Sequence, residues 1–395
     1  MSIVTSDSNS NTDSSMDWSV YRAKNFPVVN KWSYFDHAAV SPLPTPATLA
    51  IQKWMTAATQ EGDAVWPEWA ARVEEIRKTA ANLVNALPTE IAFTPSTTAG
   101  ISYVAEGLHW KEGDNIVLPS GEFPSNLYPW MHLKNSGVEL RIVETSPLGE
   151  IDLNQISEAC NQRTRLVSMS WVGYGTGYRI DPAAAAKVAH DNGALFFLDA
   201  IQGLSVFPMD VKHCDIDFFA ADGHKWMMGP EGAGLFYCKQ EHLNVLKPKG
   251  IGWNSVKNPY AFGNVELELK DSASRYEGGT QNMCGIHALG GSLDLITETG
   301  VNPTASPIGE RVLFLTDLFC EKMDSLGFTT KCSRIGNERS GIIGFTKENF
   351  DPNEARNRLL ENGVVSSVRK GLLRFSPHAY NNEEDIDRAV TTLKA

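Results

Sequence analysis

The residues DFFAADGHKWMMGPEGAGLFY (217–237) carry the strongest structural signal in the chain. An apolar run reaches Asp222, Gly223, His224 and Lys225, and glycines then break the chain before a second apolar run. Lys225 therefore follows a strand, at the edge where open α/β sheets bind ligands. Partial burial there would lower the pKa of the lysine and make its amine nucleophilic, as Schiff-base chemistry requires. A solvated lysine at a strand end is the simpler interpretation of this residue alone.

Two other segments support a ligand site at the same edge. LFFLDAIQG (195–203) places Asp199 and Gln202 just past an apolar run. A buried carboxylate is costly without a cation, and a protonated pyridine nitrogen would be one, although an aspartate that caps a turn is the alternative. TPSTTAGI (94–101) passes from a strand into a helix whose first turn is rich in hydroxyl groups. Free N–H groups there suit a phosphate, although simple N-capping would also explain them.

Apolar strands alternate with helical stretches from about residue 33 to 290, which predicts the α/β class with a mostly parallel, mixed sheet and helices on both sides. Several strands are continuous apolar runs, as expected for strands covered on both faces. The predicted strands are EIAFTPS, NIVLPS, ELRIVET, RLVSMSWV, ALFFLDA, DIDFFAA and AGLFYCK. Between them, DPAAAAKVAHDNG reads as a helix with Asp181 as N-cap and Gly193 as its stop.

The pattern changes after about residue 290, where longer helices and fewer strands indicate a smaller α+β domain. A helix over 309–327 precedes the strand SGIIGF, a helix over 352–363, the strands VVSSVRK and LLRFSPH, and a last helix over 383–394. We therefore predict four parts: a disordered tail (1–16), an arm packing on the small domain (17–32), a large cofactor-binding domain (33–290) and a small C-terminal domain (291–395).

Composition excludes several classes of protein. The 395 residues carry a formal net charge of −12, which disfavours nucleic acid as a partner. There is no apolar run of about 20 residues and no signal peptide, so we expect no membrane segment and a cytoplasmic location. The six cysteines lack the spacing of a disulfide framework or a zinc site, so we expect reduced thiols and no metal. GYGTGY (173–178) fails as a dinucleotide loop because Tyr178 takes the place of the third glycine.

LDAIQ, GHKW with its trailing glycines, and RYEGGTQN (275–282) together resemble the class V aminotransferase family of fold-type I pyridoxal 5′-phosphate (PLP) enzymes. That family includes cysteine desulfurases and isopenicillin N epimerase-like proteins. The similarity runs from YFDHAAVSPLP (34–44) to LLRFSPHAYNNEEDID (372–387). It implies the PLP-dependent transferase fold of type I, PLP as cofactor, an amino acid as substrate, and a homodimer with shared active sites.

The resemblance also implies a role for each matching residue. Lys225 would carry PLP as a Schiff base and act as the general base, and Arg374 would clamp the substrate carboxylate. Asp199 would pair with the pyridine nitrogen, and Gln202 would contact the phenolic oxygen. The other implied cofactor contacts are stacking by Phe123, phosphate binding by Thr97, Thr98 and His224, and a bond from Thr280 to the phosphate of the neighbouring subunit.

Three features depart from the desulfurase pattern. Asp222 stands where desulfurases usually have a phosphate-binding serine, so we leave it out of the predicted site, and Tyr174 replaces an asparagine. Only four residues separate Arg369 from Arg374, where desulfurases have a longer loop that bears the catalytic cysteine. We therefore expect no cysteine persulfide, and structural roles for the nearest candidates, Cys284 and Cys332.

The choice among PLP reactions stays open. Transamination of an amino acid, the class V aminotransferase activity, is the interpretation we favour from the sequence. A carbon–sulfur lyase or cysteine desulfurase-like reaction and an amino-acid epimerase are the alternatives. A catalytically dead binding protein of the same fold is disfavoured, because such a protein would need none of Lys225, Asp199 and Arg374.

Overall fold

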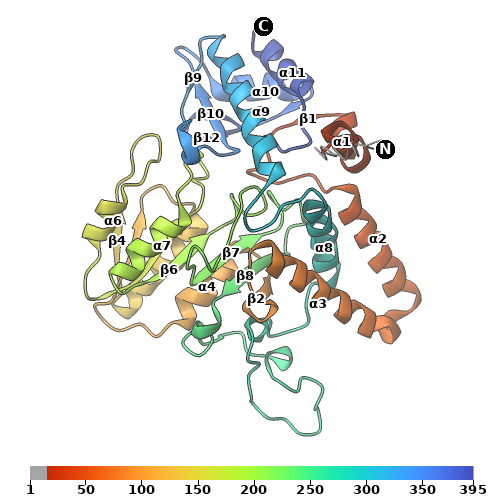
Figure 1. Ribbon diagram of the computed structural model, residues 1–395, viewed down its shortest axis with the longest axis vertical. Coiled ribbons are helices and arrows are strands. Elements are labelled where there is room, and N and C mark those ends of the chain that lie inside the picture. The colour runs from red at the N-terminus through yellow and green to blue at the C-terminus, as the bar shows by residue number, and fades with distance from the viewer. Residues whose placement is uncertain (1–15, 395) are drawn as a thin grey trace, which may run out of the picture.

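A seven-stranded sheet forms the centre of the larger part of the computed structural model, which describes residues 16–394 (Figure 1). Its strands, in spatial order, are β2 (Ile91–Thr94), β8 (Gly234–Cys238), β7 (Phe218–Asp222), β6 (Leu195–Asp199), β5 (Thr164–Ser170), β3 (Asn115–Pro119) and β4 (Glu139–Val143). The five strands from β7 to β4 are parallel, and β8 runs antiparallel to both of its neighbours. The predicted α/β class and mixed, mostly parallel sheet are therefore confirmed.

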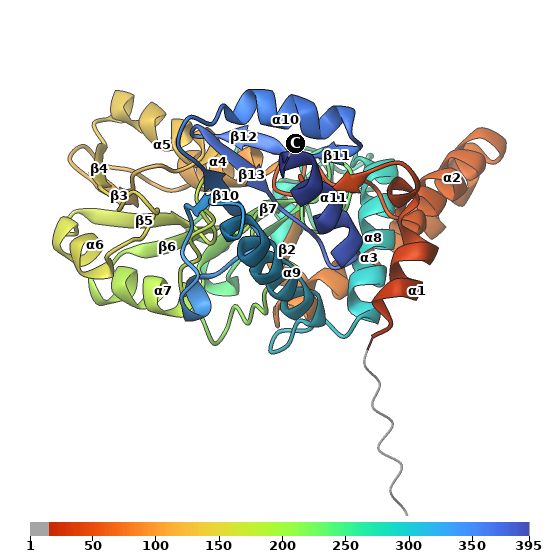
Figure 2. The same ribbon diagram turned by 90° about the horizontal axis from the view of Figure 1, so that it is seen from above.

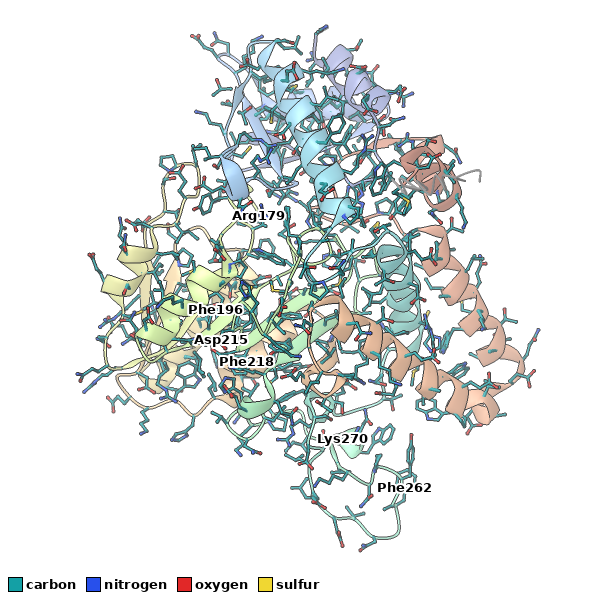
Figure 3. The ribbon with its side chains drawn as sticks, viewed as in Figure 1. Arg179, Phe196, Asp215, Phe218, Phe262 and Lys270 are labelled. Atoms are coloured by element: carbon teal, nitrogen blue, oxygen red, sulfur yellow. The ribbon has the colours of Figure 1, made fainter. Side chains whose placement is uncertain are left out.

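Alternate residues of the central strands enter two different cores, because successive side chains of a strand point to opposite faces. Phe196 of β6 lies in one core, whereas Phe197 of the same strand lies in the other, together with Phe218 of β7. Figure 3 labels Phe196 and Phe218. Helices cover both faces, with α6 and α7 on one side and α4 and α5 on the other (Figure 2). This double cover is why these strands read as continuous apolar runs.

Eleven α-helices occur within the described residues. They are α1 (Trp18–Asn25), α2 (Thr45–Gln60), α3 (Trp66–Leu83), α4 (Thr97–Gly107), α5 (Tyr128–His132), α6 (Leu153–Ala159), α7 (Pro182–Asp191), α8 (Met283–Glu298), α9 (Pro307–Asp324), α10 (Pro352–Glu361) and α11 (Glu383–Lys394). Asp181 caps α7 as predicted. Helix α4 lies directly against β7: a Cβ added at Gly100 would be 2.5 Å from the Ala220 Cβ. That close approach brings the start of α4 to the end of β7. No helix within residues 16–394 is long and apolar enough to cross a lipid bilayer.

The smaller part is built on a four-stranded antiparallel sheet. Its order is β12 (Ser367–Arg369), β13 (Leu372–Phe375), β10 (Ile343–Thr346) and β9 (Thr329–Thr330). A third core, with Phe319, Phe345 and Phe375 among its members, lies between this sheet and helices α9, α10 and α11. The segment VVSSVRK was predicted as one strand, and this is wrong. Its first half is β11 (Val364–Val365), which pairs in parallel with β1 (Ser33–Tyr34), and its second half is β12.

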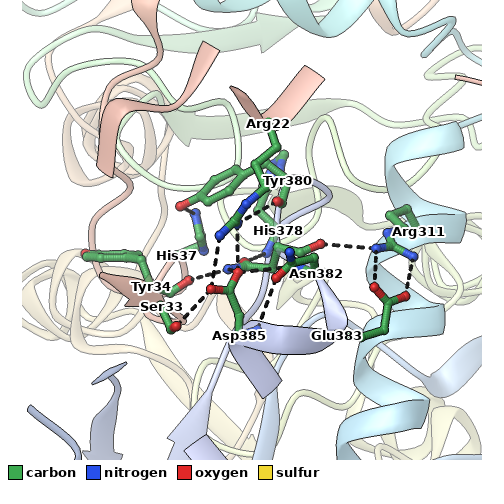
Figure 4. A network of polar contacts seen from close by, with 11 residues as sticks. Arg22, Ser33, Tyr34, His37, Arg311, His378, Tyr380, Asn382, Glu383 and Asp385 are labelled. Atoms are coloured by element: carbon green, nitrogen blue, oxygen red, sulfur yellow. Dashed lines mark hydrogen bonds and ion pairs between the residues drawn. The ribbon is translucent and has the colours of Figure 1, made fainter. Parts of the chain in front are cut away.

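The N-terminal arm contacts both parts of the chain. Arg22 of α1 forms an ion pair of 2.7 Å with Asp385 of α11 and donates to the Tyr380 carbonyl (Figure 4). Phe26 stacks on Tyr380 with ring centroids 4.0 Å apart, and it also belongs to the core of the larger part. The predicted tail lies outside the described residues except for Met16. The division into domains remains a proposal, and a boundary at residue 290 would cut α8, so we place it after that helix.

A buried ion pair anchors the segment RYEGGTQN (275–282). The Arg77 Nη1 and Glu277 Oε1 atoms are 2.5 Å apart, and both side chains are almost fully buried. Glu277 also accepts a hydrogen bond from the Phe93 backbone N–H at the start of the sheet. A buried charge that loses its partner is strongly destabilising. The position of this loop therefore depends on Arg77.

We predict that Arg77→Ala lowers the free energy of unfolding by about 3–5 kcal/mol, because Glu277 is left charged and buried. The matched control is Lys187→Ala, also a helical position, whose ion pair with Asp191 is exposed. That change should cost under about 1 kcal/mol. Urea unfolding of both variants, followed by circular dichroism, measures the difference. Equal midpoints for the two variants would contradict the anchoring role.

Candidate active site

A cavity of about 320 Å³ lies where β6 and β7 end and α4 begins, against the start of the chain and the small sheet. Its walls include eight of the nine residues predicted for the site: Thr97, Thr98, Phe123, Asp199, Gln202, His224, Lys225 and Arg374. The ninth, Thr280, is exposed and lines a separate cavity with Tyr103 and Gln281. The same walls contain residues that we did not predict: Ser125, Tyr174, Asp222 and Arg369.

Lys225 lies just beyond the end of β7 and is only 8% exposed. Burial lowers the pKa of its amine to about 8, although the nearby Asp199 carboxylate opposes the shift. The Nζ atom lies 5.5 Å from the centroid of the Phe123 ring. The neutral, nucleophilic form of this amine is therefore far more populated near neutral pH than that of an ordinary lysine.

Asp199 is buried at the end of β6 and accepts one hydrogen bond, 3.2 Å long, from the Ile201 backbone N–H. Burial, reinforced by the nearby Glu122 carboxylate, raises the pKa of Asp199 to about 7. Within residues 16–394 no cation forms an ion pair with Asp199. A buried carboxylate with so few partners fits a site that receives a cationic group.

Gln202 has an amide whose orientation is fixed by its partners. The Trp226 indole N–H can only donate, and it lies 2.7 Å from Gln202 Oε1. The Ala38 carbonyl can only accept, and Gln202 Nε2 donates to it at 3.0 Å. The second Nε2 hydrogen is the one donor left on this amide. This remaining hydrogen is compatible with the predicted contact from Gln202 to the phenolic oxygen of PLP.

Hydroxyl groups gather at the start of α4. Ser96 caps the helix by accepting from the Ala99 N–H, and Thr97 Oγ1 accepts from the Asp222 N–H at 2.9 Å. Thr98 donates to Ser125 Oγ, 2.8 Å away, which leaves the Ser125 hydroxyl hydrogen for another acceptor. Together with the first N–H groups of the helix, these hydroxyls can bind a phosphate. Sequence reasoning missed Ser125, because it comes from a separate loop.

Arg374 of β13 is 1% exposed and is held by three acceptors. Its Nε donates to Ser367 Oγ, Nη1 to the Tyr174 carbonyl and Nη2 to Asp36, at 2.8–3.0 Å. Burial lowers the pKa of the guanidinium, and the Asp36 carboxylate opposes that shift. A guanidinium has five N–H groups, so one remains on each terminal nitrogen. Those two hydrogens suit bidentate contact with a carboxylate.

The family model for class-V aminotransferases matches residues 33–389. The chain belongs to that family. A probable cysteine desulfurase of Methanothermobacter thermautotrophicus is 30% identical over 94% of this chain and 96% of its own. An uncharacterized aminotransferase of Bacillus subtilis is 25% identical, over 94% of this chain and 96% of its own.

Two solved structures show the same fold. One is the apo cysteine desulfurase of Thermococcus onnurineus, with a TM-score of 0.85 and 26% identity, over 94% of this chain and 96% of that one. The other is the cystine C–S lyase C-DES in complex with its product, cysteine persulfide. Its TM-score is 0.86 at 21% identity, over 93% of this chain and 98% of that one. The PLP-dependent transferase fold of type I is therefore confirmed, and the cofactor is PLP.

The residues of the cavity fit PLP. Asp199 has no cationic partner within the described part of the chain, and the protonated pyridine nitrogen of PLP would be one. Lys225 provides the amine that would react with the aldehyde of PLP. The hydroxyls and N–H groups at the start of α4 would hold the phosphate, and the exposed Phe123 ring would stack on the pyridine. These residue assignments remain proposals.

A tight turn connects β12 and β13, at the position where the sequence is shorter than the desulfurase pattern. Arg369 of β12 pairs with Leu372 of β13, so only Lys370 and Gly371 connect the two strands. Both have positive φ angles, 50° and 72°, as a two-residue hairpin turn requires. None of the six cysteines lines the cavity. Cys332 lies in the third core, and Cys284 is the second residue of α8.

We predict that the apoenzyme captures PLP at a rate that rises with pH and levels off above about pH 8. Only the neutral amine attacks the aldehyde, and the lowered pKa of Lys225 makes it neutral there, whereas an ordinary lysine would titrate near 10.4. Stopped-flow absorbance at a series of pH values measures this. Borohydride reduction and peptide mapping should then find the label on Lys225, and a label on another lysine would refute the assignment. Lys225→Ala, the control, should still bind PLP noncovalently.

Proposed function

We propose that this protein is a PLP-dependent carbon–sulfur lyase that acts on a cysteine-type amino acid by β-elimination. Relatives that match 94% of the chain are named cysteine desulfurases, which favours sulfur chemistry over the transamination that we favoured from the sequence. The observation that carries the proposal is the two-residue turn at Lys370 and Gly371, which leaves no loop to bring a thiol to the cavity. The chain shares the fold of a cysteine desulfurase, but no cysteine lines its Lys225 cavity.

The proposed roles follow from the geometry. When bound, PLP supplies an electron sink for a carbanion at the Cα of the attached amino acid. Lys225 is buried beside the cavity with a lowered pKa, so its amine can take the Cα proton once the substrate has replaced it. The two remaining N–H groups of Arg374 orient the substrate carboxylate, and Asp199 holds the pyridine nitrogen in its charged form. The sulfur then leaves Cβ without a protein thiol to receive it.

The product distribution from L-cysteine distinguishes the candidate activities. Elimination consumes water and gives pyruvate, ammonia and sulfide in equal amounts. A desulfurase gives alanine and transfers the sulfur, and a transaminase gives a keto acid only when an acceptor keto acid is present. An epimerase would give the D-amino acid.

We expect purified holoenzyme to give pyruvate, ammonia and sulfide, with no alanine. Replacing Cys284 and Cys332 together by serine should leave turnover within about threefold, under 1 kcal/mol in barrier, because neither thiol lines the cavity. Lys225→Ala is the inactive control. Alanine as the product, with turnover lost a hundredfold in the double variant or persulfide trapped on either cysteine, would restore the desulfurase assignment.

We also propose a homodimer with composite active sites. Thr280 is exposed and lies outside its own chain's Lys225 cavity, although the family resemblance gives it a phosphate contact. Nearby, the loop of residues 256–269 projects from the body and exposes apolar side chains at Tyr260, Phe262, Val265 and Leu267 (Figures 1 and 3). Exposed apolar clusters of this kind mark interfaces, and a two-fold interface would bury the loop on both copies at once.

The dimer proposal predicts recovery of activity from two inactive variants. In a mixed dimer of Lys225→Ala and Thr280→Tyr subunits, both changes fall in one site and the other site is intact. Random exchange at equal concentrations makes half of the dimers mixed, so about one quarter of wild-type activity should return. Mass spectrometry of the intact complexes verifies the exchange. No recovery despite proven exchange would contradict a shared site.

A further inference from the structure

Asp222 is a buried charged residue of the cavity wall that neither the family pattern nor the proposed function explains. It ends β7, directly before Gly223, His224 and Lys225, and it is buried. Both carboxylate oxygens have a partner: Oδ1 accepts from the Gly223 N–H, and Oδ2 lies 2.8 Å from His224 Nδ1. The carboxylate is therefore bound to its own neighbours, although it stands at a phosphate site.

The contact fixes one hydrogen of His224. An ionised carboxylate can only accept, so the Nδ1 atom that faces it must carry a hydrogen. A neutral imidazole with a hydrogen on Nδ1 has a bare lone pair on Nε2. Within residues 16–394 no hydrogen-bond partner is found for that Nε2, and His224 lines the cavity.

A phosphate dianion also only accepts. A neutral His224 would meet it with a lone pair, which is unfavourable, whereas an imidazolium would meet it with an N–H and a positive charge. The backbone places this contact next to the start of α4, because the Asp222 N–H donates to Thr97 Oγ1. The ring would then stand with a carboxylate on Nδ1 and a phosphate on Nε2, and two anions favour the doubly protonated form.

We propose that Asp222 is a positioning residue that holds His224 as an imidazolium, so that the Nε2–H donates to the phosphate of PLP. The chain thus replaces a direct hydroxyl donor by a carboxylate–imidazolium pair. The proposal rests on the assignment of His224 to the phosphate. It also explains how a carboxylate is tolerated there, because the imidazolium would neutralise its charge and a backbone N–H donates to it.

The test compares PLP with pyridoxal, which lacks the phosphate. Full-length apoenzyme is titrated with each compound by absorbance. The dissociation constant of pyridoxal divided by that of PLP measures how much the phosphate contributes to binding. Asp222→Asn should lower this ratio about tenfold, or about 1.4 kcal/mol, and leave pyridoxal affinity nearly unchanged. A residue needed only for folding would weaken the binding of both compounds equally.

The histidine variants provide a second test, in which the direction of each change in PLP affinity is predicted. His224→Gln leaves Asp222 unpaired beside the phosphate, so PLP affinity should fall further than in Asp222→Asn. The double variant removes that repulsion and should bind PLP more tightly than His224→Gln does. If the double variant binds more weakly than either single variant, the proposed coupling is wrong.

Asp217, which directly precedes the same strand, offers a matched control at its opposite end. It is also a buried aspartate that contacts histidines, His190 at 2.8 Å and His242 at 2.6 Å, but it lies outside the cavity. Asp217→Asn should alter stability and leave the ratio unchanged. If His224→Gln lowers the ratio and Asp222→Asn does not, the role of Asp222 is refuted while His224 stays at the phosphate. If His224→Gln has no effect, the phosphate assignment itself fails.

Discussion

Two buried groups of opposite charge, placed where two parallel strands of the central sheet end, constrain the rest of the molecule. β6 and β7 are parallel neighbours, so Asp199 at the end of one and Lys225 just past the end of the other open onto the same cavity. Neither is well compensated by the chain itself: Asp199 accepts one backbone hydrogen bond, and burial lowers the pKa of Lys225. A ligand bound in the cavity therefore has to provide a partner for each of these two groups.

Arg374 connects that edge to the smaller part of the chain. Its guanidinium donates to Asp36 near the start of the chain, to Ser367 of the neighbouring strand and to the Tyr174 carbonyl of the larger part. A planar group held at three points has little freedom, so its two remaining N–H groups face a fixed direction. The turn at Lys370 and Gly371 brings the small sheet close to the site without any inserted chain. The same hairpin thus carries Arg374, which we propose orients the substrate, and leaves no inserted loop that could bear a thiol.

The sequence predicted what is determined locally. The strands of the central sheet were predicted because each is an apolar run covered on both faces, and Lys225, Asp199 and Thr97 were predicted because each follows such a strand. The partners of Arg374 were not, since Asp36 lies 338 residues away and no local pattern announces that contact. VVSSVRK reads as one strand because neither Gly nor Pro interrupts it, whereas its first half pairs with β1 instead. The amide orientation of Gln202 likewise depends on the tertiary contact with Trp226.

The charges around the cavity indicate which ligands it can accept. The chain as a whole is acidic, with a formal net charge of −12, yet the cavity wall carries Lys225, Arg369, Arg374 and His224 against two carboxylates, Asp199 and Asp222. Asp222 is already paired with His224, and Asp199 is available to a pyridine nitrogen. Arg374 keeps two N–H groups beyond its contacts with Asp36, Ser367 and Tyr174, and Arg369 is an exposed cation of the same wall. Both arginines can therefore donate to an anionic group, and the substrate of the proposed function would bring one in its carboxylate. Under the proposed function, the wall that would hold the cofactor would thereby favour amino acids over simple amines.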